Sequence, residues 1–317
     1  MKIIVTEPLY LAEEMKQSLA ALGPVVYGPF ADDALSAELP DCEVLVVRLG
    51  RHIGAPTMRS APKLRYIVSA TTGLDHVDLD AARERSVRVV SLRDCPQAIT
   101  DVSATAEHCF GLLLALLRGT APAAAHVLDG GWDRNRFFGT QLRGKRLGIV
   151  GHGRIGAMIA HYAAAFGMDV VACDRTETKI VPPAEPLSFA ALLESCEIVS
   201  IHVTASPENR HLIDRTAIAR MRPGAFLINT ARGSIVDEQA LAEAVSSGHL
   251  AGVAVDVLEG EERDGIAASP LLARARAGHN VLITPHIGGA TYEAIRRTEA
   301  AVVNVLTALL KEEASSS

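Results

Sequence analysis

The stretch Arg146-Leu147-Gly148-Ile149-Val150-Gly151-His152-Gly153-Arg154-Ile155-Gly156 decides the fold of this chain. Its first half is an apolar run typical of a buried parallel strand. Glycines then follow at the spacing G-x-G-x-x-G, which permits a tight turn, a close backbone approach to a pyrophosphate and close packing of the next helix. The start of that helix presents N–H groups and a positive dipole end to phosphates. The stretch therefore predicts a dinucleotide site whose contacts are Gly151, Gly153, Arg154, Ile155 and Gly156.

An acidic residue follows at the spacing that such a site needs. The next expected strand ends at Asp174, eighteen residues after Gly156. A carboxylate there accepts hydrogen bonds from the adenosine ribose and repels a 2′-phosphate, so Asp174 favours NAD over NADP. Arg175 tempers this preference, because a guanidinium can pair with a 2′-phosphate. The alternative is that Asp174 only caps a strand in a similar domain that binds another ligand.

On both sides of this stretch, short and almost wholly apolar runs alternate with longer amphipathic segments. Such runs are typical of strands covered on both faces, and the alternation predicts an α/β, doubly wound parallel architecture. The tail 314–317 is expected to fray. The expected helices are 11–22, 80–85, 101–117 and 292–310, and the expected strands are 2–6, 43–47, 64–69, 146–150, 169–173, 197–202, 225–229, 251–256 and 281–284.

Length and composition exclude several classes of protein. The 317 residues suggest about two domains, and 49% apolar with 21% charged residues excludes intrinsic disorder. A net charge of −6 without a basic tract gives no indication of a nucleic-acid partner. The most apolar stretch, 109–117, is shorter than the roughly 20 residues that span a bilayer. No secretory signal is recognised at the N-terminus. From the charge and the apolar stretches together, we expect neither a nucleic-acid nor a membrane partner.

The cysteines indicate the redox compartment. There are five, an odd number, far apart in the sequence and without the spacing of a zinc site: Cys42, Cys95, Cys109, Cys173 and Cys196. We interpret them as buried free thiols in a reducing cytoplasm rather than as disulfides or metal ligands. No metal is therefore expected, and the predicted location is cytoplasmic.

Three polar residues follow expected strands in the second half of the chain, namely Arg232, Glu261 and His286. In open parallel sheets, ligands bind outside the carboxyl ends of the strands. An arginine can hold a carboxylate in a two-pronged fork, and a histidine can donate a proton to a carbonyl oxygen. A carboxylate on the other ring nitrogen orients the imidazole and favours its charged form. The set suits the reduction of a 2-keto acid by hydride.

Each of these residues also has an ordinary explanation. Arg232 alone is compatible with a surface arginine, and a histidine after Thr-Pro is compatible with a turn residue. Glu261 lies in an acidic loop with Glu259 and Glu262, and such loops are usually solvated. Spacing alone does not choose among the three carboxylates. The combination at successive strand ends favours the catalytic interpretation.

At this point the sequence resembles the D-isomer-specific 2-hydroxyacid dehydrogenase family over nearly its whole length. The motifs that carry the resemblance are Thr72-Gly73-Leu74-Asp75-His76-Val77-Asp78, Ala106-Glu107-His108, Leu142-Arg143-Gly144-Lys145, Asn229-Thr230-Ala231-Arg232-Gly233 and Thr284-Pro285-His286-Ile287-Gly288-Gly289.

The resemblance implies a role for each matching residue. Arg232 becomes the substrate-binding arginine, His286 the acid/base and Glu261 its paired carboxylate. Asp256 matches the residue near the nicotinamide amide, and Thr230 and Ala231 are implied to contact the cofactor. The backbone N–H groups of Thr72 and Gly73 are implied to bind the substrate carboxylate.

The family also implies a domain plan. A flavodoxin-like substrate domain is expected over residues 1–97 and 288–317, and a Rossmann domain that binds NAD over residues 98–287. A homodimer formed through the long helix before the glycine loop is the expected assembly.

Within the family, the sequence resembles the branch that acts on 3-phosphoglycerate. The resemblance lies in Val47-Arg48 and in Gly131-Trp132-Asp133-Arg134, and it implies that Arg48 and Arg134 bind an anionic tail. Three features depart from the branch. Ser69 stands where an arginine is common, residues 204–206 are Thr-Ala-Ser rather than Pro-Leu-Thr, and the sequence ends without a C-terminal regulatory domain. Serine feedback through such a domain is therefore not expected.

These observations predict an NAD-dependent dehydrogenase of a short 2-hydroxy or 2-keto acid with an anionic tail, such as 3-phosphoglycerate. The alternatives within the class are a hydroxypyruvate or glyoxylate reductase and a reductase of a phosphonate keto acid. An alternative from another class is a non-catalytic, NAD-sensing protein similar to the family's transcriptional corepressors. The lack of a long interaction tail counts against that alternative.

Overall fold

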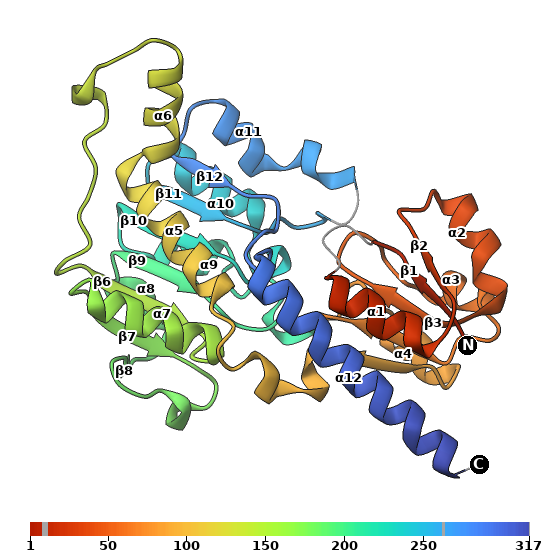
Figure 1. Cartoon of the computed structure of the whole chain (residues 1–317). Helices are drawn as coiled ribbons and strands as arrows, with labels where there is room; N and C mark the ends of the chain where they lie inside the picture. The colour runs from red at the N-terminus through yellow and green to blue at the C-terminus, as the bar shows by residue number, and fades with distance from the viewer. Residues whose placement is uncertain (8–11, 262–263, 317) are drawn as a thin grey trace. The chain divides into compact units, whose positions relative to one another are not determined.

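The computed structural model describes residues 1–7, 12–261 and 264–316, so Leu11, Glu262 and Ser317 lie outside the described residues. The described chain divides into two compact units. Unit 1 comprises Met1–Val102 and Ala290–Ser317, and unit 2 comprises Ser103–Gly289 (Figure 1). The C-terminal segment thus belongs to the same unit as the N-terminus. That unit 1 binds the substrate stays a prediction.

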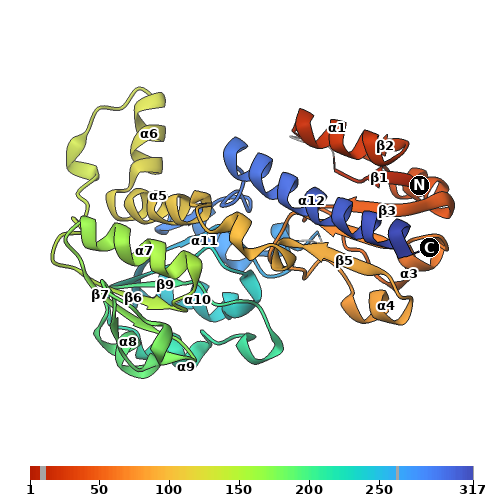
Figure 2. The same cartoon turned by 60° about the horizontal axis from the view of Figure 1, so that its bottom comes forward.

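Unit 1 is built on a parallel sheet with the strand order β2-β1-β3-β4-β5, which is the flavodoxin order. One face is covered by α1 and α12, which lie side by side (Figure 2), and the other by α2, α3 and α4. Its elements are β1 (Lys2–Val5), α1 (Glu13–Leu22), β2 (Val25–Tyr27), α2 (Asp32–Glu38), β3 (Cys42–Val47), α3 (Ala55–Ser60), β4 (Tyr66–Ser69), α4 (Leu79–Glu84), β5 (Arg88–Ser91) and α12 (Tyr292–Ser316).

Unit 2 is built on a parallel sheet with the order β12-β11-β10-β9-β6-β7-β8, which changes direction between β6 and β9. Helices α5 and α7 bury one face, and α8, α9, α10 and α11 bury the other. Its elements are α5 (Ala104–Arg118), α6 (Thr120–Leu128), β6 (Arg146–Val150), α7 (Arg154–Ala165), β7 (Asp169–Cys173), β8 (Glu185–Pro186), α8 (Phe189–Ser195), β9 (Ile198–Ile201), α9 (Arg215–Arg220), β10 (Ala225–Asn229), α10 (Glu238–Ser246), β11 (Leu250–Val255), α11 (Pro270–Arg276) and β12 (Val281–Ile283).

The predicted α/β fold class with two doubly wound parallel sheets is confirmed. The prediction that the tail frays is wrong for residues 314–316, because α12 continues to Ser316. Glu313 near its end pairs with Arg65 and also accepts a hydrogen bond from the Tyr66 hydroxyl at 2.5 Å. These contacts tie the last turns of the helix to β4 and the residue before it.

An arm leaves unit 2 after α5. The long helix ends at Gly119, whose left-handed backbone (φ +56) turns the chain into α6. The arm, residues 119–140, projects from the unit (Figure 1) and returns where the Thr140 N–H donates to the Leu117 carbonyl at 2.9 Å. Its Leu128, Trp132 and Phe138 are 88%, 89% and 82% exposed, so they do not pack on the body of unit 2.

Residues Pro96–Arg118 are the one described segment whose length and hydropathy would allow it to cross a membrane. In the structure, much of this segment is the core helix α5. Its Leu112, Leu113 and Leu116 are buried in the same cluster as Leu147 and Ile149 of β6. The apolar character of the segment is therefore explained by packing on the sheet.

Candidate active site

The glycine loop between β6 and α7 has the geometry that its spacing predicts. Gly151 has φ +96, and a Cβ there would lie 2.8 Å from backbone atoms of His202 and Val203. A Cβ on Gly156 would lie 2.2 Å from the Gly151 carbonyl oxygen. Around Gly153, by contrast, no described atom lies within 4 Å of an added Cβ. The loop is thus closed where helix and strand pack and open where a pyrophosphate would approach, so it fits a dinucleotide.

Asp174 lies directly after β7, beside this loop. Its Oδ2 accepts from the His152 N–H and its Oδ1 from the Thr176 N–H, both at 3.0 Å. Each carboxylate oxygen retains another lone pair, so ribose hydroxyls can still bind. The carboxylate is therefore held in place by the backbone, as strand capping requires, without losing the capacity to bind a ribose.

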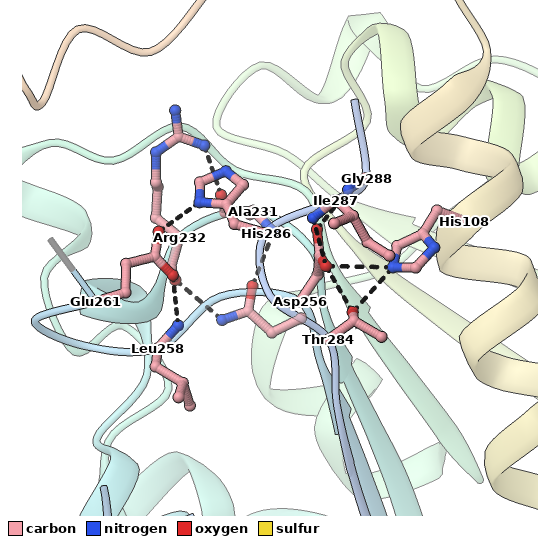
Figure 3. A network of polar contacts seen from close by, with 11 residues as sticks. His108, Ala231, Arg232, Asp256, Leu258, Glu261, Thr284, His286, Ile287 and Gly288 are labelled. Carbon is pink, nitrogen blue, oxygen red and sulfur yellow. Dashed lines mark hydrogen bonds and ion pairs between the residues drawn. The ribbon is translucent and has the colours of Figure 1, made fainter. Parts of the chain in front are cut away.

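His286 lies after β12 in an unusual backbone conformation, with φ +54. Its Nδ1 is hydrogen-bonded to Glu261 Oε1, and Glu261 Oε2 accepts from the Leu258 N–H at 2.9 Å (Figure 3). Both side chains are about a quarter exposed, at 24% and 22%. Because Glu261 occupies Nδ1, Nε2 is the ring nitrogen left for a substrate.

The structure chooses among the carboxylates that spacing left open. Glu261 contacts His286, whereas Glu259 pairs with Arg210 and His211 at 2.6 and 3.0 Å. Glu262 lies outside the described residues. A carboxylate that the sequence did not indicate supports this loop, since the buried Glu238 accepts from the Glu259 N–H at 3.1 Å and from the Ser269 hydroxyl.

The turn that carries Arg232 is fixed by Asn229, the last residue of β10. The Asn229 side chain accepts from the Ala231 N–H at 3.0 Å and donates to the Arg232 carbonyl at 2.9 Å. The next residue, Gly233, touches the loop of Glu261, because a Cβ there would lie 2.1 Å from the Leu258 carbonyl carbon. Arg232 and Glu261 are therefore carried by turns in direct backbone contact.

Asp256 anchors the loop of His286. Its carboxylate is 1% exposed and accepts from Thr284 Oγ1 at 2.5 Å and from the backbone N–H groups of Ile287 and Gly288 at 2.9 and 2.7 Å (Figure 3). These bonds hold the left-handed backbone at His286, a conformation that costs about 1–3 kcal/mol unless the surroundings enforce it. The predicted place of Asp256 near the nicotinamide stays a prediction.

His108 of α5 also contacts this anchor, 3.2 Å from Asp256 Oδ1 and 3.0 Å from Thr284 Oγ1. Because the Thr284 hydroxyl donates to Asp256, His108 Nε2 must carry the proton that Thr284 accepts. The sequence contained the Ala106-Glu107-His108 motif, but no residue pattern connected His108 to Asp256.

Thr230 and Ala231, predicted cofactor contacts, directly follow β10.

Residues 110–288 match the family model described as D-isomer specific 2-hydroxyacid dehydrogenase, NAD binding domain. The chain belongs to this family. The predictions of the family and of NAD as its cofactor are confirmed.

The chain is similar to two curated relatives and to one further solved structure. It is 38% identical over 296 residues to D-3-phosphoglycerate dehydrogenase of Mycobacterium leprae, covering 90% of this chain and 53% of the relative. It is 36% identical over 265 residues to hydroxypyruvate reductase of Thermotoga maritima, covering 84% of each. The TT0316 protein of Thermus thermophilus is similar in structure, with a TM-score of 0.84, 36% identity and coverage of 98% and 97%. The chain thus spans about half the length of its phosphoglycerate dehydrogenase relatives.

The catalytic triad predicted from the sequence, Arg232, Glu261 and His286, lies in unit 2. Thr72, Gly73 and Arg48 belong to unit 1, where Arg48 pairs with Glu299 at 3.2 Å. Burial raises the pKa of Glu299, and the Arg48 charge opposes that rise. The ion pair is the ordinary explanation for Arg48, and its tail-binding role stays a prediction.

Arg134 lies on the exposed arm. The arm begins and returns at the C-terminal end of α5, around Leu117, whereas His108 near the other end contacts Asp256. Nine residues of helix separate these two points, which is about 13 Å. The base of the arm that carries Arg134 is therefore separated along α5 from the turn of the helix that contacts Asp256.

In this member of the family, Asp174→Ala is expected to narrow or reverse the preference for NADH over NADPH. The ribose loses a charge-assisted hydrogen bond, which is expected to lower kcat/KM with NADH roughly 10- to 100-fold. At the same time, the carboxylate that repels the 2′-phosphate of NADPH is removed. Steady-state rates with both cofactors measure the ratio. Glu177→Ala, an exposed carboxylate nearby, is the matched control. Equal use of NADH and NADPH by the unmodified chain would refute the assignment.

Proposed function

We propose that the chain transfers hydride between NAD and C2 of a short 2-hydroxy or 2-keto acid. The observation that carries this proposal is the His286–Glu261 pair, which lies on a loop anchored by Asp256 and beside the turn of Arg232. When bound, NAD supplies or accepts the hydride. The chain's own residues supply the binding and the proton transfer.

In this proposal, the Arg232 guanidinium binds the substrate carboxylate and polarises the C2 carbonyl. His286 Nε2 donates a proton to the carbonyl oxygen during reduction and removes it during oxidation. Glu261 holds the imidazole so that Nε2 faces the substrate and stabilises the positive charge that the ring carries. The Thr72 and Gly73 N–H groups bind the same carboxylate.

The substrate that we favour carries an anionic tail, such as 3-phosphoglycerate, read by Arg48 and Arg134. Supporting this choice, several relatives are named D-3-phosphoglycerate dehydrogenase. A second candidate is hydroxypyruvate or glyoxylate, or a phosphonate keto acid. Two observations favour it, because Arg48 is already neutralised by Glu299 and Ser69 is fully buried.

A substrate panel with Arg134→Ala tests the choice. Against 3-phosphohydroxypyruvate, loss of a charge-assisted hydrogen bond is expected to lower kcat/KM about 10- to 100-fold. Glyoxylate has no tail, and its turnover is expected to stay nearly unchanged. Arg136→Ala, two positions along the arm, is the control, since Arg136 contacts His126 and Phe137 instead.

Equal losses for both substrates would refute the tail-binding role and favour a hydroxypyruvate or glyoxylate reductase. A phosphonate keto acid in the same panel identifies the third substrate class. NADH binding without oxidation by any 2-keto acid would instead favour the NAD-sensing binding protein.

We also propose a homodimer formed through α5 and the arm. The exposure of Leu128, Trp132 and Phe138 supports it, because such a patch is typical of a protein interface. In such a dimer, the arm would bring Arg134 to the second copy, where it could bind the tail of that copy's substrate. Sedimentation velocity of the intact chain measures the assembly, and a monomer at micromolar concentration would contradict it.

A cytoplasmic location is part of the proposal. It is supported by the cysteines, all of which are free in the structure. Burial raises the pKa of the Cys42 thiol to about 12 and that of Cys109 to about 11, so these thiols are unreactive rather than catalytic. Fractionation of the source cells tests the location.

A further inference from the structure

We propose that His76 positions the loop that binds the substrate carboxylate, acting through a hydrogen-bonded chain that runs from the buried His76 and Ser69 through the part-buried Thr71 to Gly73. The inference rests on the proposed function, in which the N–H groups of Thr72 and Gly73 bind that carboxylate. In this role His76 does not touch the substrate. It determines where the loop holds its N–H groups.

The loop, residues 71–73, comes shortly after β4, and each of its three carbonyl groups accepts a hydrogen bond from the protein. The Thr71 carbonyl accepts from the Leu92 N–H at 3.2 Å, and the Thr72 carbonyl accepts from Arg93 Nε at 2.8 Å. The Gly73 carbonyl accepts from the Thr71 hydroxyl at 2.7 Å. Within the described part of the chain, no hydrogen bond is donated by the N–H of Thr72 or Gly73. Two successive N–H groups without an acceptor in the described chain are available to bind an anion.

The direction of each hydrogen bond in the chain follows from the Gly73 carbonyl, which can only accept. The Thr71 hydroxyl donates its one proton to that carbonyl. In its 2.8 Å contact with Ser69 Oγ, it must therefore accept a hydrogen bond from the Ser69 hydroxyl. Because the Ser69 hydroxyl donates its proton to Thr71, it must accept the hydrogen bond in its 3.0 Å contact with His76 Nε2. His76 Nε2 therefore carries a proton, and one imidazole orders two hydroxyls and a carbonyl.

Burial makes this chain costly unless it has a purpose. Ser69 and His76 are both 0% exposed, in a region where the neighbouring Val77 and Val68 are ordinary core residues. Buried polar groups cost stability unless they are hydrogen-bonded, and an apolar side chain would fill the same place at lower risk. The alternative is that His76 serves only the packing of unit 1. The two roles differ in what a substitution changes.

The same geometry accounts for Ser69, which departs from the arginine common in the phosphoglycerate branch. Its hydroxyl is committed to Thr71 and His76 beneath the loop, so it cannot reach a substrate tail. The residue at position 69 thus supports the carboxylate-binding loop, whereas an arginine there would be able to contact an anionic substrate tail.

The experiment compares His76→Leu, which removes the donor, with His76→Gln, whose amide places a donor near the position of Nε2. The His76 backbone contributes its own bond, since its carbonyl accepts from the Ile53 N–H at 2.7 Å, and this bond survives either substitution. Thr71→Val, which removes the donor to Gly73 at nearly constant shape, is the second variant if His76→Leu does not fold. Arg59→Gln, exposed at the end of α3, is the control.

We expect His76→Leu and Thr71→Val each to raise KM roughly 3- to 10-fold for glyoxylate and hydroxypyruvate alike, the loss of one neutral hydrogen bond. We expect kcat at saturation and the Kd of NADH to change less than about twofold, and His76→Gln to stay close to wild type. The double variant should be no worse than the worse single variant, because the groups act as one chain. An unchanged KM, additive effects, or a His76→Gln enzyme as impaired as His76→Leu would overturn the proposal.

Binding of oxalate in the presence of NAD, measured by calorimetry, separates this inference from the proposed function. If wild type binds oxalate but reduces no 2-keto acid, the proposed function fails, and the Kd of oxalate in the variants decides the role of His76. If wild type turns over and the variants keep its KM, the role of His76 fails alone. If wild type neither binds oxalate nor turns over, the carboxylate loop and His76 both fall.

Discussion

His286→Asn is expected to lower kcat for 2-keto acid reduction by about 10²- to 10⁴-fold, the usual contribution of general acid catalysis. The asparagine side chain keeps a polar group near Nδ1, so its contact with Glu261 is retained in part, but nothing replaces the proton donor at Nε2. The Kd of NADH should stay close to wild type, because the glycine loop and Asp174 are untouched. Stopped-flow single turnover with titration of NADH measures both quantities.

His249→Asn is the matched control for this variant. His249 Nε2 contacts the Ile218 carbonyl at 2.9 Å and has no contact with the triad. If His286→Asn retains kcat, or if it loses NADH affinity as severely as kcat, His286 is not the proton donor. Glu261→Gln should also lower kcat, since the amide carries no charge to stabilise the imidazolium.

Arg232→Lys is expected to raise KM about 10- to 100-fold for every 2-keto acid, whatever its tail. The charge is kept, but the planar fork that matches a carboxylate is lost, and a charge-assisted hydrogen bond contributes roughly 1.5–3 kcal/mol. The backbone of the turn does not depend on the side chain, because Asn229 holds the Arg232 carbonyl and the Ala231 N–H. Steady-state kinetics with glyoxylate, hydroxypyruvate and 3-phosphohydroxypyruvate measure the effect.

Arg220→Lys, at the exposed end of α9, is the control for the loss of the guanidinium alone. An increase in KM confined to the phosphorylated substrate would mean that Arg232 reads the tail, and the assignment would be wrong.

The sheets were predictable from the sequence because their strands are buried on both faces and therefore read as apolar runs. β2, β5 and β8 were not predicted, and β8 has only two residues, both of them exposed. β2 has only three residues, none of them buried, and β5 begins with the exposed Arg88, so neither gives the signal of a central strand. The end of α12 was not predictable either, because its partners Arg65 and Tyr66 lie almost 250 residues earlier in the chain.

The residues of the site were predictable by position but not by partner. Residues at the ends of strands meet at one edge of a sheet, which favoured Arg232 and His286. The choice of Glu261 over Glu259 depends on how a loop folds back, which spacing does not determine. Asp256 as an anchor and His76 as a loop support are hydrogen-bond arrangements, and no periodicity of the sequence reveals them.

The contact at Gly233 has an evolutionary consequence. A Cβ at this position would overlap the backbone of Leu258 and Glu259, at 2.1 to 2.3 Å, so neither turn tolerates the addition of even one methyl group. A larger residue at position 233 would therefore require one of the two turns to shift, which would move Arg232 relative to Glu261. Arg48 in unit 1 and Arg134 on the arm are under no such restraint from this contact. Under the proposed function, a change of the preferred acid by substitution at Arg48 or Arg134 would leave the placement of Arg232 against Glu261 intact.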